Sequence, residues 1–285
     1  MDTALIISAV SMGGIGLIIA AVLAFADKKL KVEEDPRIVA ISDMLPGTNC
    51  GGCGFPGCRL FAEKLISGEA VPSACVAGGG DQARRIAEML GVDVGDHKRS
   101  IAVVLCRGGD AEATRSAVYR GERTCTAAEL TGGDKDCAYG CLGYGECVDA
   151  CNFGAMDMDP NGLPVVFYDK CVGCGACARA CPRDIIEMHP EDHTLFVYCR
   201  SHDKGPQAKK ACKVACIACT LCTKDCEVPG GIVMKDNLAT IDYGLAPQTD
   251  ASTKRCPTKC ILQGIEEHST RENFYASHPG AREAV

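Results

Sequence analysis

The sequence has 285 residues, of which 22 are cysteine and 32 are glycine, while tryptophan is absent and aromatic residues make up 5%. So few aromatic side chains leave little material for a conventional aromatic core, and a net charge of −7 offers no basic surface for nucleic acid. The composition leaves three classes open: a large disulfide-bonded protein, a zinc protein or an iron–sulfur protein.

The chain begins with an uncharged run from Ala4 to Ala26. As a helix it would be about 35 Å long, which is enough to cross a hydrocarbon core of about 30 Å. Asp2 precedes the run and three lysines between positions 28 and 31 follow it, so the positive-inside rule places the rest of the chain in the cytoplasm. We therefore predict a retained, single-pass anchor in the cytoplasmic membrane over residues 1–26. A cleaved signal peptide is the alternative.

The rest of the chain divides into a series of predicted segments. They are a charged linker (27–36), a small 4Fe-4S domain (37–97), a connecting segment (98–130), a two-cluster ferredoxin domain (131–190), a second, partly degenerate ferredoxin-like domain (191–264) and a flexible tail (265–285). Apolar spacing predicts helices at Ile38–Met44, Arg59–Ile66 and Asp81–Leu90, and short strands at Ile101–Leu105, Val165–Tyr168 and Ala239–Asp242. We expect an α+β protein with a transmembrane helix and tandem cluster-binding modules.

An internal repeat relates the two ferredoxin-like segments. Residues 136–151 (DCAYGCLGYGECVDAC) align without gaps with residues 211–226 (ACKVACIACTLCTKDC), and four cysteines coincide. Tyr144 stands where the second copy has Cys219. The two runs are therefore copies of one unit, and the first copy has lost its middle cysteine.

The plainest motif is Cys171-x2-Cys174-x2-Cys177-x3-Cys181-Pro182. In bacterial ferredoxins the first three thiolates of such a run bind one [4Fe–4S] cluster, and the fourth binds the other cluster. Zinc is the alternative, but structural zinc sites favour two CxxC pairs separated by a long spacer.

The partner run contains Cys141, Cys147 and Cys151, with Cys137 as the substitute for the ligand lost at Tyr144. The crossed ferredoxin pattern then predicts two clusters. One is expected on Cys137, Cys141, Cys147 and Cys181, and the other on Cys151, Cys171, Cys174 and Cys177. A three-iron cluster is the alternative if Cys137 is not a ligand.

The second copy of the repeat predicts one further cluster. Where its own partner run should lie, the sequence has Ala246, Thr249 and Ser252 at the ferredoxin spacing, and these side chains are poor replacements for thiolates. The predicted ligands are Cys216, Cys219, Cys222 and Cys256. This leaves Cys226 without its expected partners.

A fourth site is predicted in the segment CGGCGFPGC, together with the next cysteine along the chain. Its ligands are Cys50, Cys53, Cys58 and Cys75. The glycines let the backbone wrap closely and direct N–H groups at inorganic sulfur. An anion-binding glycine loop is the alternative for the GGCG stretch alone.

Six cysteines remain. A fifth cluster on Cys199, Cys212, Cys226 and Cys260 is one interpretation of the last module, and buried free thiols are the other. Cys106 and Cys125 are inert thiols or a redox-sensitive pair. The sequence shows no dinucleotide fingerprint, flavin attachment motif or Ser/His/Asp set, so no catalytic residue is assigned.

The order of these motifs, an uncharged helix, KVEEDPR, LPGTNCGGCGFPGC, DCAYGCLGYGECVDAC and CVGCGACARACP, resembles the B subunit of the Rnf complex, whose close relative is the SoxR-reducing complex. The resemblance extends from the first helix to about Gly264. It implies an electron-transfer subunit with about four or five [4Fe–4S] clusters. Such a subunit takes electrons from soluble ferredoxin and passes them to the membrane and flavin subunits of a ferredoxin:NAD oxidoreductase that translocates Na⁺ or H⁺.

Three other functions stay open at this point. The chain could be the electron-transfer subunit of a different membrane oxidoreductase, such as a hydrogenase or a quinone reductase, with the same cluster chemistry and other partners. It could be a zinc-bound scaffold, which predicts a colourless protein. It could also be an anchored redox sensor in which Cys106 and Cys125 form a reversible disulfide.

Overall fold

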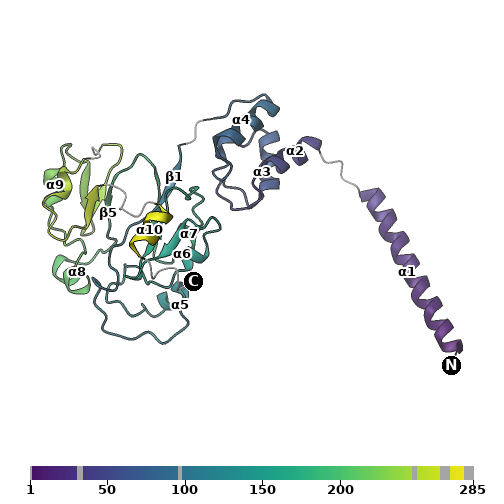
Figure 1. The fold of residues 1–285 in the computed structure, drawn as a ribbon, viewed down its shortest axis with the longest axis horizontal. Coiled ribbons are helices and arrows are strands. Elements are labelled where there is room, and N and C mark those ends of the chain that lie inside the picture. Colours follow the sequence, from purple (N-terminus) through teal and green to yellow (C-terminus); the bar gives the residue numbers. More distant parts are fainter. Residues whose placement is uncertain (1, 31–34, 96–97, 246–248, 264–269, 279–285) are drawn as a thin grey trace.

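The computed structural model describes residues 2–30, 35–95, 98–245, 249–263 and 270–278. Within these ranges, the first part of the chain is helical, and eight strands with further short helices follow. The strands pair into four antiparallel two-stranded sheets. Figure 1 shows helices α2 to α4 together as one small body, and the strands gathered in a larger one. The mixed helix and strand content confirms the expected α+β class.

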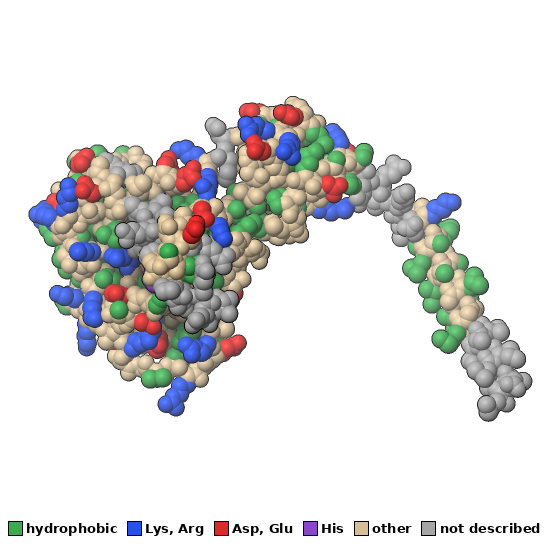
Figure 2. Space-filling model, in the orientation of Figure 1, with side chains coloured by type: hydrophobic (Ala, Val, Ile, Leu, Met, Phe, Trp, Pro, Cys, Tyr) green, Lys and Arg blue, Asp and Glu red, His purple; other side chains and the backbone are tan. Residues whose placement is uncertain are grey.

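The N-terminal element is helix α1, Asp2–Leu30. Its described apolar side chains are exposed, with 74% of Leu17 and 68% of Phe25 open to solvent. In Figure 2 hydrophobic side chains cover this part of the helix. Among the residues that the structure describes, however, no helix is both long enough and apolar enough to cross a membrane. The helix itself is confirmed, and its membrane crossing stays a prediction.

The small domain consists of α2 (Pro36–Met44), α3 (Cys58–Ile66), η1 (Pro72–Ala74) and α4 (Gly79–Leu90). Helix α2 begins where Oδ1 of Asp35 accepts a hydrogen bond from the N–H of Arg37 (2.9 Å). Ile41, Phe61 and Ile86, one from each helix, are at most 1% exposed and form the core. The three predicted helices are thus confirmed to within two residues at each end.

The first ferredoxin module has an outer sheet and an inner sheet. In the outer sheet β1 (Ser100–Val104) pairs with β4 (Ile186–Pro190), and in the inner sheet β2 (Met156–Met158) pairs with β3 (Pro164–Val166). Helices α5 (Cys125–Glu129), α6 (Glu146–Asp149) and α7 (Ala176–Ala180) complete it. The segment expected to connect two domains, 98–130, therefore contributes a strand and a helix to this module.

The second module repeats this arrangement. Its outer sheet pairs β5 (Leu195–Val197) with β8 (Ile261–Gln263), and its inner sheet pairs β6 (Ile232–Lys235) with β7 (Leu238–Ile241). Helix α9 (Leu221–Asp225) occupies the place of α6, η2 (Ala251–Thr253) that of α7, and α8 (Gly205–Ala211) precedes them. Phe196 of β5 is fully buried in the core of the first module, so the two modules pack as one body.

The C-terminal segment differs from the expected flexible tail. Helix α10, Arg271–Ser277, begins where Oγ1 of Thr270 accepts a hydrogen bond from the N–H of Asn273. Phe274 is fully buried, with its ring centroid 5.6 Å from that of Phe167. Tyr275 is buried beside it, with its ring centroid 6.3 Å from that of Phe167. The sequence hides this contact because two adjacent aromatic rings on one short helix give no periodic pattern.

The docking of α10 gives a testable prediction. Phe274→Ala should lower the free energy of unfolding by about 3–5 kcal/mol if the ring is lost from a closed core, and by less if only α10 detaches. We expect limited proteolysis to cleave near residue 270 much faster in this variant, with unchanged cleavage in Glu272→Ala, whose side chain is exposed. Equal cleavage rates for the two variants would contradict the docking.

Candidate iron–sulfur sites

All 22 cysteines are free thiols. In the described part of the chain, no three His, Cys, Asp or Glu residues are arranged to hold a single metal ion. The thiols gather instead around small cavities and in the hydrophobic cores.

The CGGCGFPGC segment folds around one cavity of the small domain. The cavity is lined by Cys50, Cys53, Cys58 and Cys75. Gly51 and Gly54 have φ values of +71° and +88°, which glycine adopts without strain, so the loop turns tightly between the thiols. The N–H of Cys58 donates to Oδ1 of Asn49 (2.8 Å) and fixes the start of α3. The structure thus brings together the four residues expected from the sequence.

The complete ferredoxin run folds around a second set of thiols. The set comprises Cys151, Cys171, Cys174 and Cys177. Burial, with a smaller contribution from the neighbouring thiols, raises the pKa of Cys177 to about 12. The N–H of Ala155 donates to Sγ of Cys151 (3.4 Å), an interaction that stabilises a thiolate. This set also matches the expected one.

A third set differs from the expected one at one position. Its cavity is lined by Cys125, Cys141, Cys147 and Cys181, among apolar side chains. Burial, followed by the neighbouring thiols Cys141, Cys125 and Cys181, raises the pKa of Cys147. From the sequence we expected Cys137 in this set, whereas the structure places Cys125 there and Cys137 in another cavity.

The position of Cys125 follows from the packing of α5 on α6. The N–H and the hydroxyl of Thr126 both donate to Oε2 of Glu146, each at 2.9 Å. Oγ1 of Thr124 accepts a hydrogen bond from the N–H of Ala127 and caps α5. These contacts hold Cys125 beside Tyr144, the residue that replaced the middle cysteine. The fourth thiol of this set therefore comes from an upstream helix, which spacing within the motif could not show.

The second module gathers the thiols of its own ferredoxin run. Cys216, Cys222 and Cys256 lie in one hydrophobic cluster with Cys260, which was not assigned to them from the sequence. Sγ of Cys260 lies 3.7 Å from Sγ of Cys256. The hydrogen bonds from Cys260 lower the pKa of both Cys216 and Cys256 below that of an ordinary thiol. Cys219 is the exposed member of the expected set, and its charge acts on Cys222.

The degenerate half of this module is used for other contacts. The hydroxyl of Thr249 donates to Oε1 of Glu227 (3.3 Å), and Ser252 is buried. Ala246, at the first position of the lost run, lies outside the described residues. Cys226 packs at the edge of the module's core, as a thiol without the partner run would.

The four residues considered from the sequence for a fifth set lie in one core, but only Cys199 and Cys212 of them line a common cavity. Cys199 and Cys212 line a cavity with Cys106 and Cys137, whereas Cys260 lies against Cys256. The expected grouping of Cys199 and Cys212 with Cys226 and Cys260 joined residues of one module. The structure joins cysteines of two modules instead, because the loops that carry them meet at the module interface.

The small domain meets the first module beside Cys174. A methyl group on Gly52 would lie 3.0 Å from Cα of Cys174, so the two backbones approach too closely for a side chain here. Nη2 of Arg179 donates to the carbonyl oxygen of Cys50 (3.3 Å). The first and second sets of thiols are therefore neighbours.

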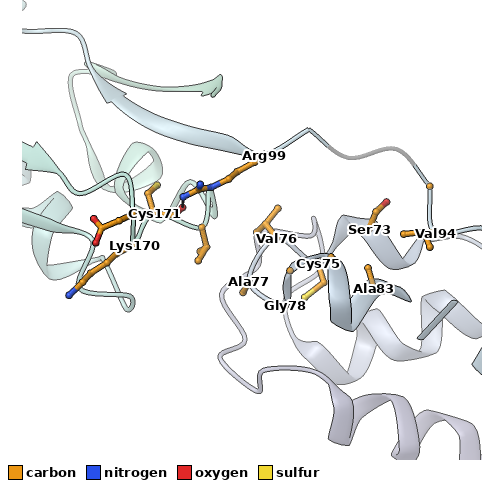
Figure 3. Close-up of a pocket in the computed structure, with 15 residues that line it drawn as sticks. Ser73, Cys75, Val76, Ala77, Gly78, Ala83, Val94, Arg99, Lys170 and Cys171 are labelled. Carbon is orange, nitrogen blue, oxygen red and sulfur yellow. Dashed lines mark hydrogen bonds between the residues drawn. The ribbon is translucent and has the colours of Figure 1, made fainter. Parts of the chain in front are cut away.

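A cleft opens at the same junction. Figure 3 shows Cys75 and Val76 on the small-domain side, with Lys170 and Cys171 on the ferredoxin side. Arg99 lies just before β1 and its side chain points toward Cys171, where the guanidinium donates to the carbonyl oxygen of Cys171 (3.2 Å). This fixed positive charge lies beside the second set of thiols, where it would favour a negatively charged cluster.

Sets of thiolates held by tight turns, together with N–H groups directed at sulfur, define an iron–sulfur protein of the ferredoxin type. A family model described as "Putative Fe-S cluster" matches residues 45–77, and another described as "4Fe-4S binding domain" matches residues 164–187.

Relatives of similar length identify the family more narrowly. The chain is 41% identical over 262 residues to the B subunit of an ion-translocating oxidoreductase complex of Methanosarcina acetivorans, which covers 92% of this chain and 99% of the relative. It is 40% identical over 267 residues (93% and 80%) to the B subunit of a Na⁺-translocating ferredoxin:NAD⁺ oxidoreductase complex of Acetobacterium woodii. It is 38% identical over 285 residues (98% and 100%) to the proton-translocating counterpart of Clostridium ljungdahlii. The chain belongs to the family of Rnf-complex B subunits.

The unexpected place of Cys125 gives a prediction. Cys125→Ala should remove one [4Fe–4S] signal from the EPR spectrum of the dithionite-reduced protein and up to about four irons per chain. Cys226→Ala, which removes a thiol outside the sets, should leave both unchanged. Retention of the full spectrum by Cys125→Ala would show that the third set takes its fourth ligand elsewhere.

Proposed function

We propose that this chain is the electron-transfer subunit of an Rnf-type complex. It takes electrons from reduced ferredoxin and carries them through [4Fe–4S] clusters to the other subunits, which couple the reduction of NAD⁺ to the translocation of Na⁺ or H⁺. The observation that carries the proposal is the contact between successive sets of thiols. It is supported by relatives that are named as subunits of ferredoxin:NAD⁺ oxidoreductase complexes.

The proposed ligands come from the sets of thiols that share a cavity or a core. They are Cys50, Cys53, Cys58 and Cys75 in the small domain, Cys151, Cys171, Cys174 and Cys177 and then Cys125, Cys141, Cys147 and Cys181 in the first module, and Cys216, Cys219, Cys222 and Cys256 in the second. Arg179 joins the first set to the second, because its side chain donates to the carbonyl oxygens of both Cys50 and Cys174. The second and third sets meet where the charge of Cys177 acts on Cys147.

The protein's own residues set the conditions for this transfer. A bound [4Fe–4S] cluster accepts and releases one electron at a time. The buried thiols exclude water from the sites, while backbone N–H groups and the guanidinium groups of Arg99 and Arg183 lie near them. These donors offset the negative charge that an added electron brings, and so keep the sites reducible.

The energy available matches the proposed coupling. An electron that falls through 100 mV releases about 2.3 kcal/mol, the same energy that moves one elementary charge against 100 mV. Two such electrons are needed to form NADH from NAD⁺, so the chain must pass electrons singly and repeatedly. The translocated ion would move through other subunits of the complex.

We further propose that α1 anchors the chain to the cytoplasmic membrane, with the remainder on the cytoplasmic side. The uncharged sequence from Ala4 to Ala26, the exposed apolar side chains of its described part and the lysines that follow it support this. The small domain follows α1 directly along the chain. Its set of thiols would then be the one nearest the membrane subunits, and the second module would face the soluble donor.

The anchor can be tested in the full-length chain expressed alone. Leu17→Lys combined with Ile18→Lys should move the protein from the membrane fraction to the soluble fraction, because each lysine costs about 2.5–3.5 kcal/mol at the centre of a span. Val39→Lys, at an exposed position of α2, is the matched control and should stay with the membrane. Equal partitioning of all the proteins would contradict anchoring by α1.

The order of transfer can be tested with Cys53→Ser. In the assembled complex this variant should still be reduced by soluble ferredoxin at the wild-type rate, while reduction of NAD⁺ should fall at least tenfold, since the exit site is lost. Cys226→Ser should leave both rates unchanged. If NAD⁺ reduction survives in Cys53→Ser, the small domain does not lie on the path.

A further inference from the structure

Four cysteines that no sequence motif joins lie around one cavity between the two ferredoxin modules. They are Cys106, Cys137, Cys199 and Cys212. Three of them are at most 8% exposed and the fourth, Cys106, is half-buried. They come from four separate segments: the loop after β1, the loop before α6, the loop after β5 and the end of α8.

Each module contributes an equivalent pair of thiols to this cavity. Cys106 and Cys199 follow β1 and β5 at the same distance, two residues after each strand ends. Cys137 and Cys212 occupy the same position in the aligned repeats. Two equivalent pairs from two copies of one unit therefore face each other across the module interface.

The backbone hydrogen bonds around the pairs repeat as well. The N–H of Cys141 donates to Sγ of Cys106 (3.4 Å), and the N–H of its counterpart, Cys216, donates to Sγ of Cys199 (3.2 Å). The N–H of Leu105, just before Cys106, donates to the carbonyl oxygen of Ile185, just before β4. In the same way, the N–H of Tyr198, just before Cys199, donates to the carbonyl oxygen of Cys260, just before β8. The arrangement is thus built twice by the same fold.

Backbone hydrogen bonds also join the two modules beside this cavity. The N–H of Thr114 donates to the carbonyl oxygen of Ala211 (2.9 Å), and the N–H of Lys213 donates to that of Glu112 (3.0 Å). An isolated β-bridge between Ala113 and Cys212 lies between these bonds. The segment after Cys106 is thereby tied to the segment that carries Cys212.

Two glycines keep the space beside the thiols free of side chains. A methyl group on Gly108 would lie 2.9 Å from Sγ of Cys212 and 3.8 Å from Sγ of Cys106. One on Gly140 would lie 3.3 Å from Sγ of Cys137 and 3.7 Å from Sγ of Cys106. Neither glycine has a positive φ, so backbone conformation does not require glycine at these positions. Space next to the sulfurs does.

The cavity also has buried positive charge. The side chain of Lys135 is 1% exposed, lines the cavity and donates to the carbonyl oxygen of Gly108 (3.2 Å). The guanidinium of Arg183 is 4% exposed and lines the neighbouring cavity of the third set. It donates to the carbonyl oxygens of Cys137 (3.0 Å) and Gly140 (2.8 Å), two residues that line this cavity. Nζ of Lys135 lies 3.7 Å from Oδ1 of Asp110, and Arg183 pairs with Glu129. The net negative charge of a cluster with four thiolate ligands would add to these carboxylates in offsetting the two buried cations.

We propose that Cys106, Cys137, Cys199 and Cys212 bind a further [4Fe–4S] cluster at the module interface. Ligation replaces the four thiol protons by iron, and the bound cluster gains and loses one electron. Zinc also binds four thiolates, but it is redox-inert and would break the path between the modules.

The position of this site completes the path. The bond from Cys141 to Cys106 joins it to the third set of thiols, and the bond from Cys216 to Cys199 joins it to the set of the second module. Its occupation by a cluster rests on the cavity alone, whereas its use as an electron carrier rests on the proposed function.

The test uses the full chain purified anaerobically, with Cys106→Ser and Cys199→Ser, one from each module, and Cys226→Ser as the control. Each of the first two should lose up to about four irons and four sulfides per chain relative to the control, together with one EPR signal after dithionite reduction. Equal iron in all the proteins, or loss of one zinc instead of iron, would overturn the proposal.

The iron content of the wild-type chain gives a further test. If both variants fail to fold, the wild-type chain decides, since more than about sixteen irons per chain is expected and sixteen or fewer overturns the fifth cluster. About sixteen irons with intact electron transfer would reject this site and keep the proposed function. A wild-type chain without iron and sulfide would reject both.

Discussion

The structure depends on one constraint: buried sulfur takes the place of large side chains in the main cores of the small domain and of both modules. The small domain closes around its cysteines beside Phe61 and Ile86, and both ferredoxin modules have cysteines inside their main apolar clusters. Burial raises the pKa of several of these thiols, as for Cys141 at about 12, so without a cluster those thiols are neutral and make only modest packing contacts. The stability of the fold should therefore follow the loading of its sites, because ligation is coupled to folding.

Duplication explains both the regular and the irregular parts of the protein. Each module has its own outer and inner sheet in the same arrangement. The alignment of 136–151 with 211–226 places equivalent thiols in equivalent loops. Each copy has then changed separately. The first replaced its middle cysteine by Tyr144 and receives Cys125 from α5, while the second lost its partner run and has Thr249 in a hydrogen bond with Glu227. The interface between the copies is where four thiols with no motif of their own meet.

Local spacing allowed much of this to be predicted. Three close thiols of a ferredoxin run lie around one short turn and helix, so Cys171, Cys174 and Cys177 could be grouped from the sequence, as could the cysteines of the small domain. Cys125 and Cys106 could not, because they reach their partners through tertiary contacts: α5 packs on α6, and the strand pairing near Ala113 joins segments about a hundred residues apart. The internal repeat does relate two of these thiols, since Cys137 aligns with Cys212. Helix α10 was missed because two adjacent buried rings, Phe274 and Tyr275, determine its position.

The central claim is that the sets of thiols hold clusters that are neighbours along one path. The most direct measurement is the EPR spectrum of the fully reduced full-length chain, recorded at two microwave frequencies. Neighbouring reduced clusters are paramagnetic and interact, so we expect broadened spectra whose splittings do not scale with frequency, and which sharpen in Cys199→Ser. A spectrum that is the simple sum of isolated clusters at both frequencies would contradict a continuous path.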